Sequence, residues 1–103
     1  MYAVGRVTEW DAAKLEAGQA EIAEFERIHA EQPGFLGSLV VDLGQNRHAT
    51  VNLWQSQAQA QAALPTVGPV VGRLLAPLMA AESQLLGTGP VIRGADLIAD
   101  DSA

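Results

Sequence analysis

Apolar and polar residues follow two different periods along the chain, and the change from one to the other marks the element boundaries. Short runs with two-residue alternation indicate strands, and longer runs with apolar residues every three or four positions indicate helices. The predicted strands are residues 2–8, 35–43, 47–54 and 84–93, and the predicted helices are residues 11–31, 57–64 and 69–76. This order is βαββαβ with a split second helix, so the pattern predicts an α+β chain of the ferredoxin-like kind with a four-stranded antiparallel sheet.

Proline and glycine define most of the predicted ends. Pro33 and Gly34 follow the long helix 11–31, which is rich in Ala, Glu, Gln and Leu and carries one apolar stripe. Proline cannot continue a helix interior, and glycine accepts left-handed geometry. For the same reason we expect Pro65 to stop the Gln-Ala helix and Pro69 to open the next one.

Two-residue alternation divides the central hairpin into two faces. The apolar face carries Leu39, Val41, Leu43, Val51 and Leu53. The mixed face carries His48, Thr50, Asn52 and Trp54. We expect the helices to leave the mixed face bare, and a bare face of this kind calls for a partner. The sequence therefore predicts a homodimer in which two sheets meet face to face.

The composition agrees with one small domain that buries an additional surface. The chain has 103 residues, of which 49% are hydrophobic and only 17% are charged. Soluble domains average about 25% charged residues, so apolar residues are abundant here. We expect residues 1–93 to form the domain and residues 94–103 to form an acidic C-terminal tail.

Charge and residue usage exclude several classes of protein. The net charge is −6, and the six basic residues are scattered, so no patch is available to replace counterions on nucleic acid. The chain has no cysteine, which excludes disulfides, thiolate nucleophiles and Cys-ligated metals. It shows neither a signal-peptide pattern nor about 18 consecutive apolar residues, so we expect a cytoplasmic protein without a membrane partner.

Two segments of the chain resemble the antibiotic biosynthesis monooxygenase-like domains, a family of small dimeric α/β-barrel proteins. The segment PGFLGS at residues 33–38 resembles the family's junction between the first helix and second strand, and VNLWQS at residues 51–56 resembles the end of its third strand. The Ala-rich helix and final strand follow in the family order. The resemblance covers residues 1–93 and implies a dimeric α/β barrel.

The resemblance also implies a cofactor-independent monooxygenase that acts on a small aromatic or quinol metabolite. In characterised members an Asn and a Trp on the third strand contact the substrate, which here implies catalytic roles for Asn52 and Trp54. One residue separates them in this chain, closer than in those enzymes. An amide can hydrogen-bond a developing oxyanion, and an indole offers a stacking face. His48 and Thr50 share their face and are candidate substrate-binding residues.

Other interpretations of the same residues stay open. Trp54 can simply pack the end of the sheet, Asn52 can satisfy a local polar contact, and His29 suits a structural place at a helix C-terminus. The alternative function is a non-catalytic ligand-binding or stress-related dimeric barrel. We expect no cofactor and no metal, because the two histidines lie far apart and no phosphate loop is present. Haem-degrading relatives carry a ligand His on the second-half helix, and residues 65–81 contain none.

Overall fold

The computed structural model describes residues 1–94, so almost all of the acidic tail predicted for 94–103 lies outside the described residues. The elements are β1 (Tyr2–Glu9), α1 (Ala12–Ala17), α2 (Gln19–Ala30), β2 (Phe35–Gly44), β3 (Arg47–Trp54), α3 (Gln57–Val70), the π-helix η1 (Val71–Leu75), the 3₁₀-helix η2 (Ala76–Leu78) and β4 (Gln84–Pro90). The predicted α+β class and the βαββαβ order are confirmed. In residues 1–94 no helix has both the length and the apolar character needed to cross a membrane.

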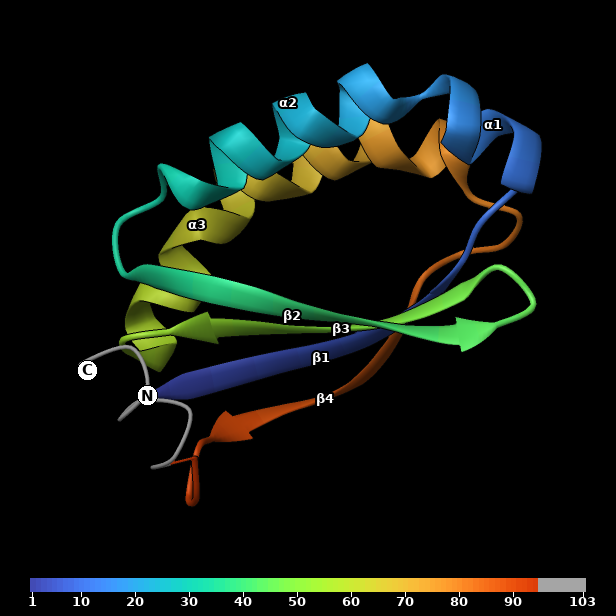
Figure 1. Ribbon diagram of the computed structural model, residues 1–103. Coiled ribbons are helices and arrows are strands. Elements are labelled where there is room, and N and C mark those ends of the chain that lie inside the picture. Colours follow the sequence, from blue (N-terminus) through green and yellow to red (C-terminus); the bar gives the residue numbers. More distant parts are fainter. Residues whose placement is uncertain (95–103) are drawn as a thin grey trace, which may run out of the picture.

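The four strands form one antiparallel sheet in the order β2-β3-β1-β4, and the helices lie over one of its faces (Figure 1). β4 is an edge strand, as the proline at its end, Pro90, suggested. The hairpin between β2 and β3 turns at Gln45 and Asn46, whose φ angles are 56° and 62°. Positive φ at both central residues matches the right-handed twist of the strands on either side.

The single helix predicted for residues 11–31 is wrong, because Gly18 divides it into α1 and α2. At this break Gly18 lies close to Leu78, the last residue of η2. A Cβ atom at Gly18 would lie 2.6 and 2.7 Å from the Leu78 methyl groups and 2.9 Å from the Lys14 carbonyl oxygen. Only glycine fits this approach without a shift of its neighbours. The local sequence favours a helix here, but a contact sixty residues away in the chain decides its shape.

Gly18→Ala is therefore expected to lower the free energy of unfolding. Inserting a methyl group into a filled space typically costs about 1–3 kcal/mol. The matched control is Gly68→Ala inside α3, where an added Cβ meets nothing within 4 Å. That change should stabilise the protein by up to about 1 kcal/mol, since alanine favours helix over glycine. Urea denaturation followed by circular dichroism measures both, and a neutral Gly18→Ala variant would contradict the close approach.

The expected stop at Pro65 is also wrong, since α3 runs through both Pro65 and Pro69 to Val70. Ala60 and Ala63 of this helix are buried in the core, with partly buried Val67 packed against them. Each proline removes one backbone donor, and the tertiary packing of the buried side outweighs that loss. Beyond Val70 the backbone widens into η1 and then tightens into η2.

The expected assignment of the two sheet faces is reversed. Trp54 is 4% exposed and packs against Ala60 and Ala63, so the mixed face lies under the helices. The apolar face is bare: Leu39, Val41 and Leu43 are 45%, 52% and 42% exposed. The physical reason lies in the large aromatic side chains of Tyr2, Phe35 and Trp54, which share the mixed face and bury far more area than the aliphatic residues opposite.

Candidate functional site

A row of polar side chains runs along β3 beneath the helices. His48, Thr50 and Asn52 are half-buried and alternate onto the same face as Trp54. The unbroken register between β1 and β3 places Thr8, Arg6, Val4 and Tyr2 opposite these four residues in that order. The structure therefore brings all four predicted site residues onto one face, the face that looks toward the helices.

Asn52 is tied to the neighbouring strand by its side chain. It lies opposite Ser38 of β2, and the Ser38 hydroxyl donates to Asn52 Oδ1 over 2.5 Å. On its other side the ladder partner is Val4, which is apolar. Among residues 1–94 no group accepts a hydrogen bond from Asn52 Nδ2. The amide can therefore offer N–H donors to a ligand oxygen.

Trp54 forms one wall of an aromatic cluster between the sheet and α2. Its ring lies 5.2 Å from Phe35 and 5.6 Å from His29, both in edge-on geometry. Such pairs stabilise a core beyond their buried area. This packing agrees with the structural interpretation of Trp54, and its indole ring also forms an apolar boundary next to Asn52, two residues away along the strand.

His29 is a buried imidazole at the end of α2, where the sequence predicted a structural histidine. It is 6% exposed and lies 5.1 Å from Phe25, 4.3 Å from Phe35 and 5.6 Å from Trp54 between ring centres. Within residues 1–94 its ring nitrogens make no hydrogen bond. Burial lowers the pKa of His29 below its usual value of 6.5. The four-residue spacing from Phe25 on the apolar stripe was the available signal for this position.

This lowered pKa predicts a loss of stability in mild acid. The unfolded chain takes up the His29 proton near pH 6.5, before the folded protein does, so unfolding is favoured as the pH falls from 7 through the folded pKa. His29→Phe removes the titrating group and suits the aromatic surroundings. Urea denaturation between pH 7.5 and about 5 should give a flatter stability profile for the variant. His48 is present in both proteins, so its contribution cancels in the comparison. Parallel stability profiles for the parent protein and the variant would contradict the prediction.

His48 lies at the opposite end of the row from Trp54, near the hairpin turn. Its ring centre is 6.1 Å from that of Trp10, whose buried Nε1 has no hydrogen-bond partner in residues 1–94. The neighbouring Thr8 hydroxyl lies 3.1 Å from that of Ser83. The length of β3 thus separates His48 from His29. In the described part of the chain no three His, Asp or Glu side chains gather where they could share a metal ion, and the predicted absence of a metal stays a prediction.

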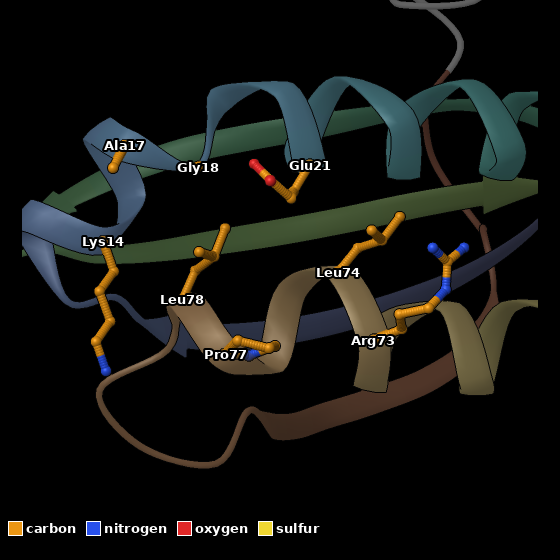
Figure 2. Close-up of a pocket in the computed structure, with 8 residues that line it drawn as sticks. All are labelled: Lys14, Ala17, Gly18, Glu21, Arg73, Leu74, Pro77 and Leu78. Atoms are coloured by element: carbon orange, nitrogen blue, oxygen red, sulfur yellow. The ribbon is translucent and has the colours of Figure 1, made fainter.

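A groove lies within the helical layer. Figure 2 shows this groove between α1–α2 and η1–η2, with Leu74 and Leu78 turned toward the opposite helices and the Glu21 carboxylate close to α2, on the side of Gly18. The groove holds about 390 Å³ and is also lined by Lys14 and Arg73. All of its lining residues are helical or at a helix end, and none is a predicted site residue. It is therefore a different surface from the sheet face that carries Asn52.

Comparison with solved structures finds the same fold in several proteins. An asparagine-to-alanine mutant of SnoaB, a cofactor-independent oxygenase from Streptomyces nogalater, matches with a TM-score of 0.69 and 18% identity over 90% of this chain and 94% of its own. A protein of unknown function from Nitrosomonas europaea matches with a TM-score of 0.71 and 13% identity over 90% of each chain. A structure described as an antibiotic biosynthesis monooxygenase matches with a TM-score of 0.72 and 11% identity over 90% of this chain and all of its own.

The similarity is one of structure rather than of sequence. No family model matches the chain, and no curated protein sequence matches it. At these identities the structural matches establish the fold alone. They confirm the likeness to antibiotic biosynthesis monooxygenase-like domains that the two segments of sequence indicated.

Proposed function

We propose that this chain, which has the fold of the antibiotic biosynthesis monooxygenase-like domains, is a cofactor-independent monooxygenase of a small aromatic or quinol metabolite. The observation that carries the proposal is the amide of Asn52. Its side chain is half-buried on the face of β3 that looks toward the helices, and Trp54 lies two residues away on the same face. Within residues 1–94 its N–H donors have no hydrogen-bond acceptor. A flat aromatic ligand with one oxygen atom at its edge complements this pair.

The proposed chemistry needs little from the protein beyond placement and electrostatics. The bound substrate releases a proton to solvent, either from the carbon next to its carbonyl group or from its phenol hydroxyl, and the negative charge spreads onto that oxygen. Asn52 donates to this oxygen, which stabilises the charge where it develops. The carbanion then supplies electrons to dioxygen. One proton is taken up again by the peroxide that forms with dioxygen, before water leaves. At an activated CH₂ carbon one oxygen atom enters the product as a carbonyl and the other leaves as water. At the Trp54 end of the row, the buried rings of Trp54 and His29 limit the access of water.

The proposed assembly is a homodimer that closes two bare sheet faces against each other. Leu39 and Val41 are about half exposed on a face that no described helix covers, and Val51 and Leu53 continue it onto β3. Exposed apolar patches of this kind mark protein interfaces. A second copy supplies a matching surface, because a two-fold axis pairs the same patch with itself. The result would be the α/β barrel that the resemblance implies.

Oxygen uptake tests the proposal. Purified protein that shows no flavin or haem absorbance is incubated with a panel of quinols and anthrones in an oxygen electrode. Uptake above the uncatalysed rate supports the monooxygenase. The alternative is a non-catalytic ligand-binding or stress-related dimeric barrel, favoured by the close packing of Trp54, which is only 4% exposed. Binding without oxygen uptake across the panel would favour that alternative.

A further inference from the structure

We propose that Ser38 is a positioning residue: it holds the Asn52 amide with its N–H donors toward the ligand, and the site thereby selects ligands that present a hydrogen-bond-accepting oxygen. The selection among ligands rests on the proposed function. The positioning of the Asn52 amide by Ser38 is a property of the protein without a ligand. The two residues come from different strands, and each lies directly opposite the other in the β2–β3 ladder.

The length of the contact decides which way the amide faces. A serine hydroxyl can donate or accept, so on chemical grounds alone it could hold either the oxygen or the nitrogen of the amide. The observed separation is 2.5 Å, from Ser38 Oγ to Asn52 Oδ1. Bonds of the O–H···O type span about 2.5–3.0 Å, whereas N–H···O bonds span about 2.7–3.2 Å. The short distance fits a hydroxyl that donates to the amide oxygen and not an amide that donates to the hydroxyl.

Within residues 1–94, the surroundings of Asn52 leave the donor side of the amide without a partner. Its ladder partner on β1 is Val4, and its neighbours along the same face of β3 are Thr50 and Trp54. None of these accepts a hydrogen bond from Nδ2 within residues 1–94. With Oδ1 occupied, the group presents N–H donors. A carbonyl or phenolate oxygen satisfies them, and a ligand N–H group does not.

The first part of the test uses the free protein and needs no substrate. The side-chain amide protons of Asn52 are observed by ¹⁵N NMR in the parent protein, Ser38→Ala, Ser38→Thr and the control Ser83→Ala. Ser83 bonds to the Thr8 hydroxyl and does not contact Asn52. We expect the two amide protons to have well-separated chemical shifts in the parent protein, in Ser38→Thr and in the control. In Ser38→Ala they should move toward the values of a freely rotating asparagine. An unchanged signal in Ser38→Ala would overturn the proposal, whatever the protein catalyses.

The second part uses two probes with the same three-ring frame. Anthrone carries a carbonyl oxygen, and 9,10-dihydroanthracene carries none. One net hydrogen bond contributes about 0.5–1.5 kcal/mol, so the parent protein should bind anthrone about 2- to 12-fold more tightly. Ser38→Ala should lower this ratio, because the released amide must first be oriented by the ligand, and Ser38→Thr should restore it. The two parts of the test can give different results. If NMR shows that the amide is released in Ser38→Ala but the parent protein binds both probes equally, the positioning role of Ser38 remains. The selection for an accepting oxygen is then overturned, and the proposed substrate class with it.

Discussion

Val41→Asp is expected to convert the proposed homodimer into a monomer. Val41 is 52% exposed on the apolar face that the described helices leave bare, next to Ala49 of β3. In a dimer that closes this face, the new carboxylate would be taken out of water without a partner. The effective penalty for a buried ion is several kcal/mol, so the dimer dissociation constant should rise at least about a hundredfold.

The neighbouring valine provides a matched control for this change. Val40 is 61% exposed, but it points to the opposite face of the same strand. Val40→Asp should therefore leave the dimer intact while making the same change of size and charge. Sedimentation equilibrium at micromolar concentration distinguishes the two variants. A parent protein that sediments as a monomer, or two variants that dissociate equally, would contradict an interface on the apolar face.

Asn52→Ala is expected to abolish most of any oxygenase activity without unfolding the protein. Loss of one positioned donor to a developing oxyanion typically lowers kcat by about a hundred- to a thousandfold. The side chain is half-buried and lies outside the aromatic core, and its partner Ser38 is exposed and can bond to water instead. Circular dichroism and sedimentation should therefore match those of the parent protein.

Thr88→Ala serves as the control for the loss of activity. Thr88 lies on β4 opposite Val4, so it is a polar residue of the same face on the far side of β1 from Asn52. Its removal should change kcat by no more than about twofold, in line with ordinary surface substitutions. If Asn52→Ala retains the oxygen uptake of the parent on every active quinol, the amide has no catalytic role and the site must lie elsewhere.

The strands could be predicted from the sequence because their signals are local. Two-residue alternation and the turn residues between residues 44 and 46 set the positions of β2 and β3 closely. The helix breaks could not be predicted in this way. Gly18 is a break because Leu78 packs against it, and Pro65 is not a break because the buried alanines of α3 hold the helix in place. Both outcomes depend on residues that are distant in the chain.

The site could be predicted only in part for a similar reason. Alternation correctly grouped Asn52 with Trp54, but it does not say which face the helices cover. The contact with Ser38 depends on the register of the hairpin, which shifts between Asp42 and Gly44, on the turn side of this pair. A bulge of this kind changes every pairing beyond it, and a slip of one residue would turn the serine to the other face. The partner of Asn52 therefore becomes visible only in the folded sheet.

The central place of β1 in the sheet has a consequence for the order in which the protein can fold during synthesis. β1 leaves the ribosome first, yet both of its neighbours come later: β3 begins at Arg47 and β4 at Gln84. Once β3 has been made, it can pair with β2 as a local hairpin and with β1 across a longer connection. Strands that are distant in the chain lose conformational entropy when they are brought together, before their contacts form. This loss slows the pairing of β1 with its neighbours. The sheet is therefore completed only after translation of β4, which adds to the free edge of β1.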